Sequence, residues 1–146
     1  MKKTVRLVVD SQLEALNQVQ SWFNHWYRSL GPEFSWVESN CDRLNIAVAE
    51  GFTNAVRHAH ARLPTETPIA IDVKLARDCV NIRIWDHGQP FDPNQLQDPK
   101  PGSLLCNGGY GWFLLKRAVD QVAYWRQGSQ NCLEITQYRH QSDDFR

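Results

Sequence analysis

Residues 44–59 read LNIAVAEGFTNAVRHA and combine the clearest helical pattern of the chain with two informative polar residues. Apolar positions recur here at intervals of three and four, which predicts an amphipathic helix from about Val37 to Ala61. Its expected buried face comprises Leu44, Ala47, Val48, Phe52, Ala55 and Val56. Glu50 and Asn54 are four residues apart, so they share one side of this helix, next to the apolar stripe.

Upstream of this helix, the sequence predicts one strand and one further helix. Residues 4–9 (TVRLVV) are rich in β-branched residues and roughly alternate, which is typical of a strand. Residues 12–30 carry apolar side chains at helical spacing, and Gly31-Pro32 ends the pattern.

Downstream, the sequence predicts two pairs of strands separated by a loop and a helix. The first pair covers residues 69–75 and 80–84, with a turn at Arg77-Asp78. Residues 87–108 show no periodicity and contain four prolines, so we expect a long loop that serves as a lid. A helix over 110–120 and strands over 121–125 and 132–138 follow, and the polar tail from His140 to Arg146 is expected to fray.

This order of elements favours an α+β fold over a doubly wound parallel sheet, because the strands come in hairpins. We expect a two-layer sandwich with helices on one face of a mixed sheet. The 146 residues, of which 42% are hydrophobic, suit a single domain spanning residues 1–146.

Composition excludes several classes of function. Sixteen basic and sixteen acidic residues give a formal net charge of zero, which does not favour nucleic acid as a partner. The four cysteines form no C-x-x-C pair, so a zinc site is not expected. No apolar segment is long enough to span a bilayer or to serve as a secretory signal, and we expect a cytoplasmic protein with no membrane partner.

Glu50 and Asn54 form the first candidate site. A carboxylate and an amide on one helix face can direct a proton acceptor and a Mg²⁺ ligand toward one point, because Mg²⁺ prefers hard oxygen ligands together with phosphate oxygens. An ordinary surface pair is the alternative, since such pairs are abundant in helices.

The segment DHGQPFDP (86–93) forms the second candidate site, at the end of an apolar strand. Asp86 can accept a hydrogen bond from an exocyclic amine, and Gly88 allows the backbone to approach a flat ring closely. A plain turn is the alternative, because Asp-x-Gly followed by proline is favourable turn chemistry.

The segment GGYG (108–111) forms the third candidate site, immediately before a helix. Free N–H groups at a helix N-terminus bind phosphate, and glycine lets the phosphate come close. A flexible loop end is the alternative. The segment is not a Walker A loop, because Trp112-Phe113 stands where Lys-Ser or Lys-Thr would follow, and it does not follow a strand as a dinucleotide fingerprint does.

Together, the three segments resemble the sequence boxes of the anti-sigma-factor serine/threonine kinases. EGFTNAVRHA (50–59) is similar to their N box, DHGQPFDP (86–93) to their first glycine box, and GYG (109–111) with the residues that follow to their second. The resemblance covers residues 44–136 in detail. It implies the Bergerat nucleotide fold, which is also found in histidine kinases, gyrase and mismatch-repair ATPases.

The resemblance also implies cofactors and residue roles. ATP and Mg²⁺ would bind, with Glu50 as the general base, Asn54 as the Mg²⁺ ligand and Asp86 as the acceptor for the adenine amino group. The expected nucleotide-binding residues are Asn54, His58, Asp86, Gly88, Phe91, Gly108, Gly109, Tyr110, Gly111 and Trp112. His58 and the nearby His60 are equally well interpreted as polar residues of a helix end.

The same resemblance implies partners. Members phosphorylate a serine or threonine of a small anti-anti-sigma (STAS-type) protein and sequester a sigma factor, usually as homodimers. One departure leaves an alternative open: the arginine that often precedes the second glycine box is absent from residues 105–108 (LCNG), and neither Lys100 nor Lys116 stands at its place. A nucleotide-gated binding protein with little kinase activity is therefore the alternative, while a histidine-kinase fragment is disfavoured because no phospho-acceptor helix pair precedes residue 37.

Overall fold

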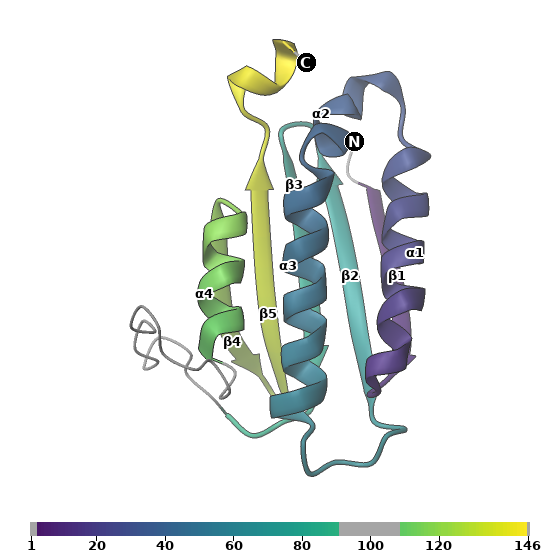
Figure 1. The fold of residues 1–146 in the computed structure, drawn as a ribbon, viewed down its shortest axis with the longest axis vertical. Helices are drawn as coiled ribbons and strands as arrows, with labels where there is room; N and C mark the ends of the chain where they lie inside the picture. Colours follow the sequence, from purple (N-terminus) through teal and green to yellow (C-terminus); the bar gives the residue numbers. More distant parts are fainter. Residues whose placement is uncertain (1–2, 91–108, 146) are drawn as a thin grey trace.

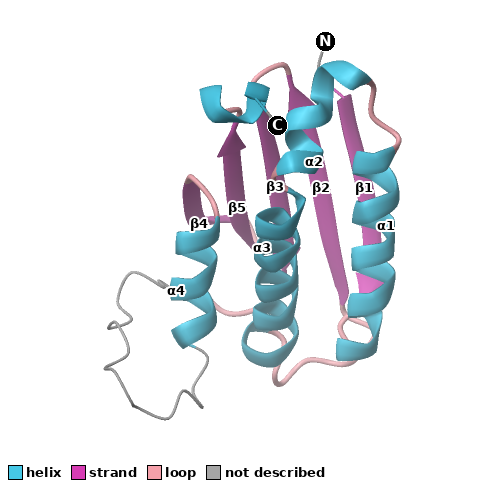
Figure 2. Ribbon diagram, turned by 45° about the horizontal axis from the view of Figure 1, so that its top comes forward, coloured by secondary structure: helices cyan, strands magenta, loops and turns pink. Residues whose placement is uncertain are grey.

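The computed structural model describes residues 3–90 and 109–145, which form two layers. One layer is a five-stranded sheet, and the other consists of helices that lie side by side across one of its faces (Figures 1 and 2). The predicted α+β two-layer sandwich is therefore confirmed. Within the described residues, no helix combines the length and apolar character that crossing a membrane requires.

The sheet has the strand order β1-β2-β3-β5-β4, and all four pairings are antiparallel, whereas we expected a mixed sheet. The strands are β1 (Lys3–Asp10), β2 (Pro68–Ala76), β3 (Cys79–Asp86), β4 (Gln121–Gln127) and β5 (Gln130–Tyr138). Strands β3 and β4 run in the same direction, but β5 inserts between them and pairs antiparallel with both. A helix lies between β3 and β4 in the chain, which lets these two strands run in the same direction. The hairpin that follows β4 then places β5 between them, so they do not pair with each other.

The helical layer is built from three longer helices and several short turns. The longer helices are α1 (Leu16–Arg28), α3 (Cys41–Asn54) and α4 (Gly109–Ala118), and the short elements include α2 (Ser35–Ser39) and 3-10 turns at Leu13–Ala15, Pro32–Phe34 and Gln141–Phe145. Helix α3 lies between α1 and α4 over the middle of the sheet (Figure 1). The apolar stripe predicted for it is confirmed, because Leu44, Val48 and Phe52 are fully buried.

The helix expected from Val37 to Ala61 is interrupted at Asn40, and the interruption involves the C-terminal tail. The buried side-chain amide of Asn40 donates to the carbonyl of Trp36 (2.7 Å) and to Oδ2 of Asp143 (3.2 Å). Its amide oxygen accepts a hydrogen bond from Arg43. The prediction of a frayed tail is therefore wrong for residues 141–145, because Asp143 anchors a 3-10 turn to the junction between α2 and α3.

We expect the substitution Asp143→Ala to destabilise the protein by about 1–3 kcal/mol, because it leaves a buried donor of Asn40 without its acceptor and removes the acceptor of the His140 backbone N–H. Urea denaturation monitored by tryptophan fluorescence measures the change. Ser142→Ala, at an exposed neighbouring position, is the matched control and should leave the free energy of unfolding unchanged. Equal midpoints for the two variants would contradict the anchoring role.

Candidate functional site

The last turns of α3 bring Glu50 and Asn54 close to the sheet. Gly51 permits this approach, because a Cβ placed on it would lie 2.6 Å from Cδ1 of Ile84 and 2.8 Å from Cδ2 of Leu133. Directly after Asn54 the helix widens into a π turn (Ala55–Ala59), in which the N–H of His60 donates to the carbonyl of Ala55 (2.8 Å). The sequence pattern did not predict this turn, and such turns are frequent at functional sites.

The first turn of α4 faces these two side chains. A Cβ placed on Gly111 would lie 2.7 Å from Oε2 of Glu50 and 3.2 Å from Oδ1 of Asn54. The structure therefore brings two of the predicted segments, 50–54 and 109–111, into contact. Because residue 111 has no side chain, the backbone at the N-terminus of α4 stands directly against a carboxylate and an amide, and its N–H groups lack helical partners.

The electrostatics of Glu50 are set by burial and by Arg57. Desolvation raises the pKa of the Glu50 carboxyl above its usual value, and the positive charge of Arg57 acts in the opposite direction. Arg57 lies in the π turn that follows Asn54, and its side chain is exposed. Sequence reasoning did not single out Arg57.

Asp86, at the end of β3, is held by donors from three segments. Its side chain is only 3% exposed. Oδ1 accepts hydrogen bonds from the N–H of Gly88 (2.9 Å) and from Nδ2 of Asn131 on β5 (2.8 Å), and Oδ2 accepts one from the hydroxyl of Tyr124 on β4 (2.9 Å). The register explains this convergence, since Asp86 pairs with Asn131, which in turn pairs with Arg126. The resemblance included Tyr124 in the stretch after the second glycine box without giving it a role, and sequence reasoning did not identify Asn131 or Arg126.

Gly88 lies between the end of α3 and the β4–β5 hairpin. A Cβ placed on it would lie 2.6 Å from the carbonyl oxygen of Ala59, so only glycine fits without a shift of the backbone. On its other side, the carbonyl of Gly88 accepts hydrogen bonds from Nη1 of Arg126 (3.1 Å) and from Nδ2 of Asn131 (3.3 Å). The plain-turn alternative for residues 86–88 does not account for these contacts with two other elements.

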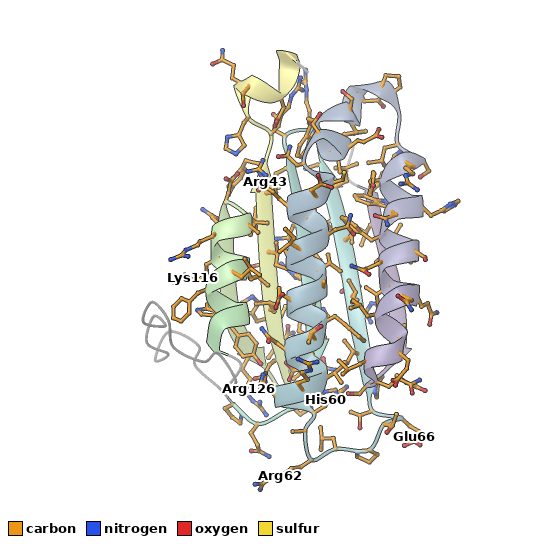
Figure 3. The ribbon with its side chains drawn as sticks, in the orientation of Figure 1. Arg43, His60, Arg62, Glu66, Lys116 and Arg126 are labelled. Carbon is orange, nitrogen blue, oxygen red and sulfur yellow. The ribbon has the colours of Figure 1, made fainter. Side chains whose placement is uncertain are left out.

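His60, rather than the predicted His58, turns inward at this end of the helix. His58 is exposed, whereas His60 is 3% exposed and accepts a hydrogen bond at Nε2 from the N–H of His87 (2.7 Å). Nδ1 therefore carries the proton of the neutral ring, and it is buried without a hydrogen-bond partner among the described residues. Figure 3 shows His60 and Arg126 at the same end of the molecule, beside the end of α3.

The remaining predicted residues have different outcomes. Phe91, Gly108 and Lys100 lie outside the described residues. Gly109 and Tyr110 begin α4, and Trp112 is buried in the hydrophobic core. Lys116 stacks over the rings of Trp112 and Phe113 and projects from the outer side of α4, away from α3 (Figure 3).

Comparison with protein families matches residues 9–137 to the histidine kinase-like ATPase domain. The chain belongs to the histidine kinase-like ATPase family. Two curated relatives carry the name serine-protein kinase RsbW. One, from a bovine strain of Staphylococcus aureus, is 31% identical over 92% of this chain and 86% of its own length. The other, from Halalkalibacterium halodurans, is 28% identical over 82% of this chain and 74% of its own length.

A solved structure of this family supports the same fold. The crystal structure of the RsbU and RsbW domains of a Mycobacterium tuberculosis protein superposes on 93% of this chain and 32% of that chain, with a TM-score of 0.65 and 17% sequence identity. The resemblance to the anti-sigma-factor serine kinases, drawn from the three sequence boxes, is therefore confirmed at the level of family and fold.

We expect His60 to make stability depend on pH. Burial lowers the pKa of His60 below its ordinary value of about 6.5, with Asp86 raising it and His87 lowering it further. A lowered pKa means that the unfolded chain binds the proton more tightly. The stability contributed by neutral His60 is then fully present above about pH 6.5 and is lost as the pH falls through the folded-state pKa.

Urea denaturation at pH 7.5 and pH 5.5 measures this effect. His60→Gln, which keeps an acceptor for the N–H of His87, should lose less stability between the two pH values than the unchanged protein. The exposed His25→Gln serves as the control and should retain the full pH dependence. An identical pH dependence in all three proteins would exclude His60 as its source.

Proposed function

We propose that this chain binds Mg²⁺-ATP between α3, the end of β3 and the start of α4, and transfers the γ-phosphoryl group to a serine or threonine of a small protein partner. The observation that carries the proposal is the contact of Gly111 with Glu50 and Asn54. It joins a helix N-terminus, which favours phosphate, to a carboxylate and an amide suited to phosphoryl transfer.

At the phosphate end, three groups bind the phosphates and the cation or supply positive charge. The N-terminus of α4 supplies free N–H groups and the positive end of a helix dipole. Asn54 offers an amide oxygen to Mg²⁺. An amide oxygen suits a Mg²⁺ ion that is held by one or two protein groups together with phosphate oxygens. Arg57 supplies a positive charge that acts on Glu50.

At the base end, Asp86 and Gly88 fit an adenine ring. Asp86 is an acceptor at the end of a strand, and the bare backbone at Gly88 leaves room beside it. With its phosphates at α4 and its base at Asp86, the nucleotide would extend from the end of β3 to the start of α4, beside the end of α3.

For the chemistry, Glu50 is the group that takes the proton from the attacking hydroxyl. Desolvation raises its pKa, which makes the carboxylate a stronger base than an exposed one. Mg²⁺ supplies neutralisation of charge on the transferring phosphoryl group. Phosphoryl transfer depends mostly on positioning and charge, so a few well-placed protein groups suffice: the carboxylate of Glu50, the amide of Asn54, the positive charge of Arg57 and the N-terminus of α4.

The identity of the partner rests on the family. Relatives named serine-protein kinases support a protein substrate, and the anti-sigma-factor kinases that the sequence boxes resemble act on a STAS-type anti-anti-sigma protein and bind a sigma factor. We extend both partners to this chain, together with a homodimeric state and a cytoplasmic location.

A second candidate function is a nucleotide-gated binding protein with little transfer activity. The absence of an arginine in residues 105–108 favours it, because a cation at the γ-phosphate accelerates transfer by orders of magnitude. In our proposal Arg57 supplies the positive charge at the γ-phosphate. The kinase and the binding protein therefore differ in whether Arg57 accelerates phosphoryl transfer.

We expect Asp86→Asn to weaken ATP binding by roughly 10- to 100-fold, since a hydrogen bond to a charged group contributes about 1.5–3 kcal/mol. Isothermal titration of Mg²⁺-ATP into the purified chain measures the affinity. Asp78→Asn, in the exposed turn between β2 and β3, is the matched control and should bind as the unchanged protein does. No binding by the unchanged protein at millimolar ATP would refute the nucleotide site.

We expect Glu50→Gln to retain ATP binding but to lose at least 100-fold in transfer of labelled phosphate to a STAS-type partner, because the proton acceptor is removed. Arg57→Ala should lower the transfer rate at least tenfold, while Arg62→Ala, which removes an exposed arginine from the following loop, should not. Tight ATP binding without measurable transfer by the unchanged chain would favour the binding protein over the kinase.

A further inference from the structure

Tyr124 is hydrogen-bonded to the carboxylate of Asp86, which in the proposed nucleotide site binds the base. Its hydroxyl donates to Oδ2 of Asp86 at 2.9 Å. The side chain belongs to β4, an edge strand of the sheet, and lies in the stretch that follows the second glycine box, where the resemblance gives it no role. Burial and the negative charge of Asp86 raise the pKa of Tyr124 far above its usual value, so the hydroxyl keeps its proton and remains a donor.

The other oxygen of Asp86 is fully engaged. Oδ1 accepts from Gly88 and from Asn131, at 2.9 and 2.8 Å. The orientation of the Asn131 amide is itself fixed, because its oxygen accepts from Nη1 of Arg126 (3.1 Å) and its nitrogen also donates to the carbonyl of Gln89 (3.0 Å). Asn131 therefore presents its NH₂ group, and not its oxygen, to the carboxylate.

A count of lone pairs then shows where a ligand can bond. A carboxylate has about four acceptor positions, and three of them are taken by the donors named above. The position that remains is on Oδ2, beside the hydroxyl of Tyr124. Asp86 can thus accept one further hydrogen bond, and Tyr124 fixes the orientation of the oxygen that accepts it.

We propose that Tyr124 is a positioning residue that makes the site select purine bases carrying an amine at position 6, by holding Asp86 as an acceptor for a single donor. This inference rests on the proposed function. An amino group at position 6 of the base donates into the remaining position. A carbonyl there, as in guanine or hypoxanthine, sets an acceptor against an acceptor, and a base with hydrogen at this position makes no bond to Asp86.

Two nucleotides that differ only in this amino group test the proposal. Dissociation constants of Mg²⁺-ATP and of Mg²⁺-purine riboside triphosphate, which lacks the amine, are measured by calorimetry for the full chain and for Tyr124→Phe. The ratio of the two constants reports the selection for the amine. We expect Tyr124→Phe to reduce that ratio at least fivefold, through weaker ATP binding, and to change binding of the purine riboside triphosphate less than twofold.

Tyr138→Phe is the matched control, because it removes a tyrosine hydroxyl whose partner is Gln121, on an exposed part of the sheet. Its ratio should equal that of the unchanged chain. Both nucleotides are titrated into one preparation, so partial unfolding lowers the stoichiometry and leaves the ratio unaffected.

Two results would contradict the role of Tyr124 and leave the proposed nucleotide site unaffected. Equal weakening of both nucleotides would make the hydroxyl a purely structural group, and tighter ATP binding by Tyr124→Phe would make it a competitor of the base for Oδ2. If the unchanged chain binds neither nucleotide, the proposed function fails and this inference fails with it.

Discussion

The close packing of α3 against the sheet at Gly51 is the constraint on which the rest of the site depends. Two buried side chains, Ile84 and Leu133, occupy the space that any larger residue would need, so the helix axis lies near the strands. Glu50 precedes this contact and Asn54 follows it by less than one turn. Glu50 and Asn54 are half-buried because the helix lies so close to the sheet. The same burial desolvates the Glu50 carboxyl and raises its pKa.

The two ends of the candidate site are built on different physical principles. At Gly111 a bare helix N-terminus meets polar side chains of another helix, and the arrangement leaves backbone donors for a ligand. At Asp86 the polar groups already satisfy one another, through hydrogen bonds that cross three strands. A satisfied buried network holds its members rigidly, and this suits recognition of a base.

Much of the fold follows from the sequence because hydrophobic periodicity is a local property. The strand and helix order was predicted, as was the apolar face of α3. Expectations that depended on distant residues were less accurate. The break at Asn40 and the ordered turn near Asp143 arise from a hydrogen bond between residues 103 positions apart, and no local pattern signals it. The antiparallel sheet likewise depends on β5 inserting beside β3.

By itself, the sequence determined the family, the two-layer architecture and the identity of the carboxylates and glycines in the three boxes, because these are carried by spacing within short segments. Only the tertiary structure decided which residues complete the site. Tyr124, Asn131 and Arg126 reach Asp86 and Gly88 through strand register, and His60 is buried at the end of the widened helix, where it accepts a hydrogen bond from the N–H of His87. Strand register and helix widening depend on packing between elements that are distant in the sequence, so local sequence patterns do not predict them.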